Sequence, residues 1–215
     1  IIWEGDNPDD VKKISYKEDD KLGGKDPYSA SKATCEIISN SYLNTYFLNS
    51  KNKGLATARA GNVIGGLDWS QKRLIPDLVN AVKYKKIVKI RNIKSIRPWQ
   101  FILDPLYGYL LLAQNLYKKP DKFSGAWNFG PSKKNSITVK EIINITNQYF
   151  DNKLKIKTKK NIYKEEKILM LNSYKAKKNL NWKPKYSIQK SLEKTYEVYM
   201  QSINKKDIIN IVKKQ

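Results

Sequence analysis

The stretch PYSASKATCEIISNSYLNTYFLNS, residues 27–50, followed by GLATARAGNVIGG, residues 54–66, decides the fold class of this chain. The first stretch begins with a proline, which suits the first position of a helix. Its apolar residues keep helical spacing, and we expect them to form the packed face: Ala30, Ala33, Ile37, Ile38, Tyr42 and Tyr46. The second stretch predicts an apolar strand that ends in a glycine-containing loop. A helix leading into a buried strand indicates an α/β layer.

The rest of the chain continues this alternation of helices and strands. Apolar periodicity predicts helices over residues 73–86, 104–120, 138–150, 173–180 and 187–203, and strands over residues 87–91, 125–131 and 153–160. Thr138 stands three positions before Glu141, which is the spacing of a capping box, whereas Ser187 starts a helix without an acidic partner at that distance. The pattern predicts a mostly α/β fold.

Composition excludes several classes of chemistry. The 215 residues include no histidine and a single cysteine, Cys35, so histidine-dependent triads and an internal disulfide framework are ruled out, and we expect no metal site. The single thiol fits a reducing cytoplasm, and we expect Cys35 to lie on the core face of its helix as a structural residue. The longest apolar stretch, YGYLLLAQNLY, is too short and too interrupted to span a bilayer.

The net charge of +22 raises the alternative of a nucleic-acid-binding protein. Lysines are scattered over nearly every segment, however, which is typical of a solvated surface. The arginines are different, because all of them lie between residues 59 and 97: Arg59, Arg73, Arg91 and Arg97. Since the guanidinium group binds phosphate through two parallel hydrogen bonds, this clustering indicates a small phosphorylated ligand.

A tyrosine and a lysine one helical turn apart, Tyr28 and Lys32, are candidates for proton transfer. Taken alone, the pair is equally compatible with two surface residues of an ordinary helix. The glycines nowhere give the GxGxxG or GxxGxxG spacing of a dinucleotide-binding turn, so the turn that cradles the cofactor phosphates is not in this chain.

Six stretches together resemble one family in order and spacing. They are LGGKDPYSASKA (22–33), ARAGNVIGGLDW (58–69), RLIPD (73–77), IRPWQFILDPLYGYLLLA (96–113), AWNFGP (126–131) and LNSYKAKKNLNWKPKYS (171–187). The chain resembles the NAD-dependent epimerase/dehydratase family of extended short-chain dehydrogenases/reductases, and RAGNVIGGLDW with IRPWQ is most similar to the CDP-glucose 4,6-dehydratases. The resemblance implies the second half of a Rossmann-type doubly wound sheet plus a smaller α/β substrate-binding domain.

The implied domain boundary follows the motifs. Residues 1–66 would be the C-terminal part of the NAD-binding domain, and residues 67–215 would bind the sugar nucleotide, with 97–120 returning to pack on the first domain. Tyr28 and Lys32 would be both catalytic and cofactor-binding. Tyr28 would take the proton of the C4 hydroxyl, and Lys32 would hold the nicotinamide ribose. A tyrosine hydroxyl normally titrates near ~10, and a nearby lysine with a cationic nicotinamide favours the phenolate.

The implied reaction is that of a lyase in deoxysugar and polysaccharide biosynthesis. NAD borrows a hydride from C4 of CDP-glucose, water is lost across C5 and C6, and the hydride returns to C6. The resemblance places Asn62, Arg73 and Arg97 beside the substrate diphosphate and Asn128 in the same site, although each asparagine also suits an ordinary turn. We expect Trp69, Trp99, Trp127 and Trp182 to pack in the core.

Two departures from the family pattern limit this expectation. Phe101 stands where the family has a histidine after RPWQ, and the glycine-rich NAD turn and the elimination acid–base residues would lie upstream of residue 1, which is not a methionine. We therefore expect a truncated chain that is inactive by itself and a homodimer when complete. The alternatives are a related epimerase or reductase, or a non-catalytic module that binds a nucleotide sugar or nucleic acid.

Overall fold

A computed structural model describes residues 15–48, 50, 52–159 and 169–203; residues 1–14 of the expected first domain lie outside them. The helices are α1 (Pro27–Tyr42), which continues into a π-helical turn (Leu43–Phe47), α2 (Leu74–Lys83), α3 (Leu103–Lys118), α4 (Pro120–Phe123), α5 (Val139–Tyr149), α6 (Tyr174–Leu180) and α7 (Ile188–Ile203). The strands are β1 (Ala56–Ala60), β2 (Asn62–Ile64), β3 (Ile87–Ile90), β4 (Ile96–Phe101), β5 (Gly125–Phe129), β6 (Ser136–Thr138) and β7 (Lys155–Thr158). A 3₁₀ turn (Lys133–Asn135) precedes β6.

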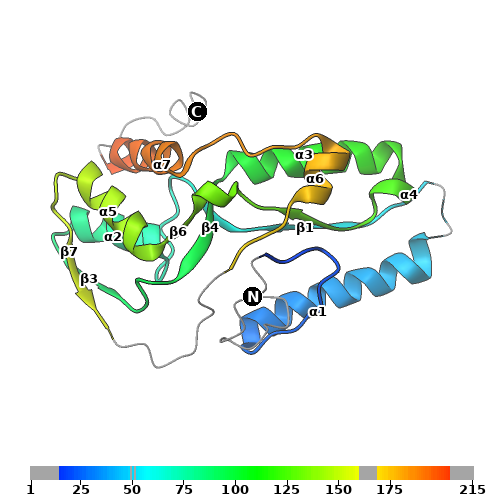
Figure 1. The fold of residues 1–215 in the computed structure, drawn as a ribbon, viewed down its shortest axis with the longest axis horizontal. Coiled ribbons are helices and arrows are strands. Elements are labelled where there is room, and N and C mark those ends of the chain that lie inside the picture. Colours follow the sequence, from blue (N-terminus) through cyan, green and yellow to red (C-terminus); the bar gives the residue numbers. More distant parts are fainter. Residues whose placement is uncertain (1–14, 49, 51, 160–168, 204–215) are drawn as a thin grey trace.

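Parallel pairing dominates the strands, and the predicted α/β fold is confirmed. β1 runs parallel to β5, with Ala56 opposite Gly125, and β3 runs parallel to β7. β2 is parallel to β4, which also pairs with β6 in the antiparallel sense. Figure 1 shows α3 and α6 on one side of the β1–β5 pair and α1 on the other; α1 and α3 both contact β1, and α6 contacts β5. The strand pair is therefore sandwiched between helices, as parallel strands usually are.

Two apolar clusters form the core. The first cluster lies between α2, α5, α7 and the strands beside them and contains Ile64, Ile75, Leu78, Val79, Ala81, Val88, Ile90, Trp99, Ile142, Ile143, Phe150, Ile188, Leu192, Tyr196 and Tyr199. The second lies between α3, α4, α6 and β5 and contains Leu112, Phe123, Trp127, Phe129, Ala176, Leu180 and Trp182. Among the described residues, no helix combines the length and apolar composition that crossing a membrane requires.

Helix α1 packs differently from the prediction. Only Ser29 and Ala33 are buried in it, and Cys35 is exposed, so the expected core position of that cysteine was wrong. Most of the expected packed face is also exposed: Ala30, Ile37, Ile38, Tyr42 and Tyr46. Helical spacing identifies residues that share a face, but it does not show whether another element covers that face.

Local signals gave most of the other elements correctly. The Thr138 capping box is present, with Thr138 and Glu141 each accepting from the other's backbone N–H, and the half box at Ser187 is present as well. The strands β4 and β6 were not predicted, and two further assignments differ. Residues 62–64, expected in a loop, form β2, because they find a partner in β4; and Pro120, expected to end a helix, begins α4.

Candidate active site

A cavity of about 580 Å³ lies where α1, the β1–β2 connection and the start of α2 meet. Three of the predicted site residues line it together: Tyr28 from α1, Asn62 from β2 and Arg73 from the turn before α2. The remaining lining residues are Gly61, Val63, Ile64, Gly65, Asp68, Lys72, Leu74, Ile75, Pro76, Trp99 and Tyr199. The volume lies in the range of small-molecule sites.

The start of α1 fixes Tyr28 at the edge of this cavity. Asp26 caps the helix by accepting hydrogen bonds from the Ser29 N–H at 3.0 Å and the Ser29 hydroxyl at 2.5 Å. Tyr28 is 70% exposed, and the Lys32 ammonium nitrogen lies 5.8 Å from the centroid of its ring. The predicted tyrosine–lysine proximity is therefore present, as a cation over an aromatic ring.

The first turn of α2 makes the cavity favourable for an anion. Arg73 stands at the N-cap in an extended conformation, and its side chain forms no capping hydrogen bond. The first backbone N–H groups of a helix, together with the positive end of its dipole, attract negative charge. Lys72, held in the left-handed region at a φ of 63°, adds a second cation beside Arg73. The combination suits a phosphate or diphosphate.

Asp68 and Tyr199 order the loop that closes this end of the cavity. The Tyr199 hydroxyl donates to the Asp68 carbonyl, and the Tyr199 ring meets Trp69 edge-on, with centroids 4.9 Å apart. Burial raises the pKa of Tyr199, so this hydroxyl stays protonated as a donor. Partial burial tends to raise the pKa of Asp68, but hydrogen bonds from Ser70 and the charge of Arg73 outweigh it and hold the pKa below its usual value.

The ion pair between Asp68 and Arg73 is loose. Their closest atoms, Asp68 Oδ2 and Arg73 Nη1, are 3.7 Å apart, and the two side chains are 38% and 67% exposed. Such surface pairs contribute little to stability, so a more highly charged ligand can recruit this guanidinium at small cost. Lys72, Asp68 and Tyr199 were not among the predicted site residues. Two sequence features could have indicated Asp68 and Lys72 as site residues: the LDW stretch, which contains Asp68, and the position of Lys72 next to Arg73.

Three predicted residues do not line the cavity: Lys32, which lies beside the Tyr28 ring, Arg97 and Asn128. Arg97, on β4, is half-buried, and its Nη1 donates to the Ile96 carbonyl at 2.9 Å. Asn128, on β5, is fully buried, and its side-chain amide donates to the Tyr16 carbonyl at 3.1 Å. Its backbone N–H donates to Glu18. Asn128 therefore ties the N-terminal segment to β5 in this structure.

The remaining expectations concern arginines and large aromatic residues. Arg59 is buried in an ion pair with Glu36, so it does not contribute to an exposed phosphate site. Trp99, Trp127 and Trp182 are buried, as expected for packing residues, whereas Trp69 is 38% exposed. Phe101, which replaces the family's histidine, is buried against the Tyr186 ring.

Comparison with known proteins gives one family and several solved structures. A profile described as GDP-mannose 4,6 dehydratase matches residues 10–195. The CDP-glucose 4,6-dehydratase of Salmonella typhimurium is 37% identical over 205 residues, which cover 93% of this chain and 57% of that protein. This chain thus spans little more than half the length of that relative.

The solved structures share the fold at low sequence identity. The dTDP-glucose 4,6-dehydratase DesIV of Streptomyces venezuelae, with NAD and TYD bound, has a TM-score of 0.77 at 18% identity, covering 92% of this chain and 58% of that one. The UDP-glucose 4-epimerase of Thermotoga maritima, with UDP-glucose, has a TM-score of 0.75 at 19% identity, covering 90% and 59%. These likenesses confirm the predicted Rossmann-type α/β fold class.

Proposed function

Because the chain belongs to the GDP-mannose 4,6 dehydratase family, we propose that it forms part of an NAD-dependent sugar-nucleotide 4,6-dehydratase that acts on CDP-glucose. The observation that carries this proposal is the single cavity lined by Tyr28, Asn62 and Arg73, one residue for proton transfer and two for holding a diphosphate. The similarity to a CDP-glucose 4,6-dehydratase supports the choice of nucleotide.

The substrate diphosphate would lie at the start of α2. There the uncapped helix N-terminus, the Arg73 guanidinium and the Lys72 ammonium supply positive charge, and the Asn62 amide can donate a hydrogen bond. In this proposal the sugar extends from the diphosphate toward Tyr28. Arg97 and Asn128, which the family resemblance also assigns to the substrate, would contribute only after a change from the positions they occupy here.

Tyr28 would accept the proton of the sugar C4 hydroxyl as the C4–H bond breaks, because Tyr28 lines the same cavity as Asn62 and Arg73. Lys32, one turn along α1 and 5.8 Å from the Tyr28 ring centroid, would hold the nicotinamide ribose. NAD supplies the acceptor for the C4 hydride when it is bound. The residues of this chain fit its nicotinamide end only, since no glycine-rich turn for its phosphates is present.

The domain division is part of the proposal. Residues 1–66 would belong to the cofactor domain and residues 67–215 to the substrate domain, with 97–120 returning to the first. The packing of α3 on β1 supports that return. β5 pairs with β1, and α6 packs on β5. These contacts support assigning β5 and α6 to the cofactor domain as well.

A homodimer of the complete protein is also proposed. The exposed apolar residues of α1, including Ile37, Ile38 and Tyr42, form a surface that a second copy could cover. Sedimentation of the protein expressed from its complete coding sequence is expected to give a dimer at micromolar concentration. A monomer under those conditions would contradict this part of the proposal.

Replacing Arg73 by alanine is expected to weaken binding of CDP-glucose by about 10- to 100-fold, because a charge-assisted hydrogen bond contributes about 1.5–3 kcal/mol. Calorimetric titration of the chain with CDP-glucose measures this effect. Arg91→Ala is the matched control, since Arg91 is exposed and does not line the cavity. Equal affinities for the two variants would count against the proposed site, and tight, salt-dependent binding of duplex DNA alone would favour a nucleic-acid-binding protein.

A further inference from the structure

A buried ion pair joins the helix that carries Tyr28 and Lys32 to the sheet. Arg59 on β1 donates from Nε to Glu36 Oε1 at 2.9 Å and from Nη2 to Glu36 Oε2 at 3.0 Å. The Thr57 hydroxyl donates to the same Oε2 at 2.7 Å. The arginine and glutamate side chains are only 7% and 13% exposed. Thr57 and Arg59 are two residues apart, so both face α1 from the same side of β1.

This pair is a bidentate, charge-assisted contact between α1 and β1. The buried residues of α1, Ser29 and Ala33, are small, and the large apolar side chains of the helix are exposed. Burial raises the pKa of Glu36, but hydrogen bonds from Arg59 and Thr57 outweigh it and hold the pKa below its usual value. The carboxylate is therefore ionised at neutral pH, with a geometry fixed by three hydrogen bonds.

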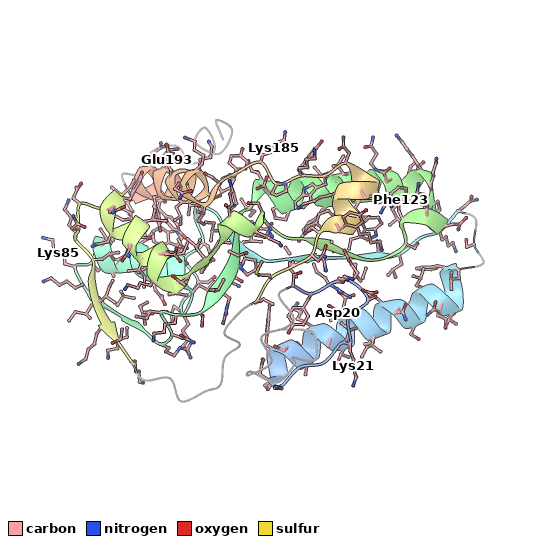
Figure 2. The ribbon with its side chains drawn as sticks, viewed as in Figure 1. Asp20, Lys21, Lys85, Phe123, Lys185 and Glu193 are labelled. Atoms are coloured by element: carbon pink, nitrogen blue, oxygen red, sulfur yellow. The ribbon has the colours of Figure 1, made fainter. Side chains whose placement is uncertain are left out.

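The pair also connects to the segment before α1. Arg59 Nη1 donates to the Glu18 carbonyl at 3.1 Å, and the Glu18 carboxylate accepts the Asn128 N–H at 2.9 Å. Figure 2 shows Asp20 and Lys21 on this segment as it passes α1. The helix, β1 and the incoming segment thus meet at one guanidinium group, and the Glu18 carboxylate extends the connection to β5.

The position of the pair links it to the candidate active site. Glu36 lies one helical turn beyond Lys32 and two turns beyond Tyr28, while Arg59 lies three residues before Asn62. Tyr28 and Asn62 line the same cavity but belong to different elements. A bidentate pair between α1 and β1, the strand that leads directly into β2, therefore limits how far α1 can slide or rotate relative to Asn62.

We propose that Glu36 and Arg59 are positioning residues that hold Tyr28 in register with the substrate site. This inference rests on the proposed function, since it assigns the pair a role in that reaction. The structure favours a positioning role because an ion pair with two parallel hydrogen bonds restricts the orientation of α1 relative to β1. Apolar contacts are not directional in this way. Displacement of a reacting group by about 1 Å can cost ~10²-fold in rate.

The test separates positioning from stability by replacing both partners with apolar residues. Exchange of a buried ion pair for apolar residues of similar volume is often neutral or stabilising, whereas removal of one partner is strongly destabilising. The double variant Glu36→Leu with Arg59→Met, made in the complete protein with NAD, is expected to keep the melting temperature and the KM for CDP-glucose. We expect kcat to fall about 10- to 100-fold.

A matched control removes an exposed ion pair that does not line the cavity. Lys190 and Glu193 on α7 are 2.9 Å apart, with side chains 50% and 44% exposed, and Figure 2 shows Glu193 along the upper edge of the view and α1 along the lower edge. Lys190→Gln with Glu193→Gln is expected to leave kcat, KM and the melting temperature unchanged. An equal loss of kcat in this control would overturn the proposal.

Three outcomes are distinguishable. Absence of turnover in the unaltered protein would reject the proposed function itself. Full kcat in a folded Glu36→Leu/Arg59→Met variant would overturn only the positioning role. Should that variant not fold, Arg59→Lys keeps the charge but loses the second parallel hydrogen bond. A fall in kcat with unchanged KM in Arg59→Lys would support the proposal, and unchanged kcat would overturn it.

Discussion

Replacement of Tyr28 by phenylalanine is expected to lower kcat for the conversion of CDP-glucose by about 10²–10⁴-fold, the usual contribution of a general acid–base residue. The change removes one hydroxyl oxygen and keeps the ring. That ring lies in the first turn of α1, where the Asp26 cap and Ser29 fix the backbone, so the fold should be unaffected. The measurement is steady-state turnover of the complete protein with NAD.

Tyr42→Phe is the matched control for this prediction. Tyr42 lies at the last position of the same helix, is 54% exposed and does not line the cavity. We expect this variant to turn over normally, and we expect both variants to bind CDP-glucose with the affinity of the unaltered protein. Normal turnover by Tyr28→Phe would refute the catalytic assignment.

Replacement of Trp182 by alanine is expected to lower the free energy of unfolding by about 3–5 kcal/mol, because it opens a large cavity in the second core cluster. Trp182 is fully buried, and its ring meets Phe129 edge-on, with centroids 5.2 Å apart. Its Nε1 donates to the Asp104 carbonyl at 2.9 Å. Denaturant unfolding followed by circular dichroism measures the effect.

Two further variants help to interpret this loss of stability. One keeps an aromatic ring at position 182, and the other removes an exposed aromatic residue as a control. Trp182→Phe retains an aromatic ring but removes the hydrogen bond from the indole N–H to the Asp104 carbonyl, at an expected cost of about 0.5–1.5 kcal/mol. Tyr117→Ala removes an aromatic residue that is 90% exposed, and we expect it to change stability by less than about 0.5 kcal/mol. Similar losses from Trp182→Ala and Tyr117→Ala would contradict the burial of Trp182 described here.

Sequence reasoning succeeded where the signal is local. The capping box at Thr138 depends on two residues three positions apart, and the structure contains it. The alternation of apolar helices and short strands likewise gave the α/β class. β2 was missed because its strand character comes from pairing with β4, a partner more than thirty residues away in sequence.

The candidate site was predictable only in part, because it also depends on contacts between segments that are distant in the sequence. Tyr28, Asn62 and Arg73 were found through motifs, and folding brings them to one cavity. The clustering of arginines gave no means of separating Arg73, which is exposed, from Arg59, which is buried against Glu36. That difference depends on which helix packs over β1, and periodicity within a single segment does not contain this information. The burial of Cys35 was predicted wrongly for the same reason, since periodicity does not show which face of α1 is covered.

The mass of the reaction product tests the central claim most directly. The complete protein, incubated with NAD and CDP-glucose, is expected to release a sugar nucleotide lighter than its substrate by one water molecule, with a methyl group at C6 and a ketone at C4. Tyr28→Phe, run in parallel, should release almost none of it. A product of unchanged mass would show an epimerase instead, and unaltered CDP-glucose would contradict the dehydratase assignment altogether.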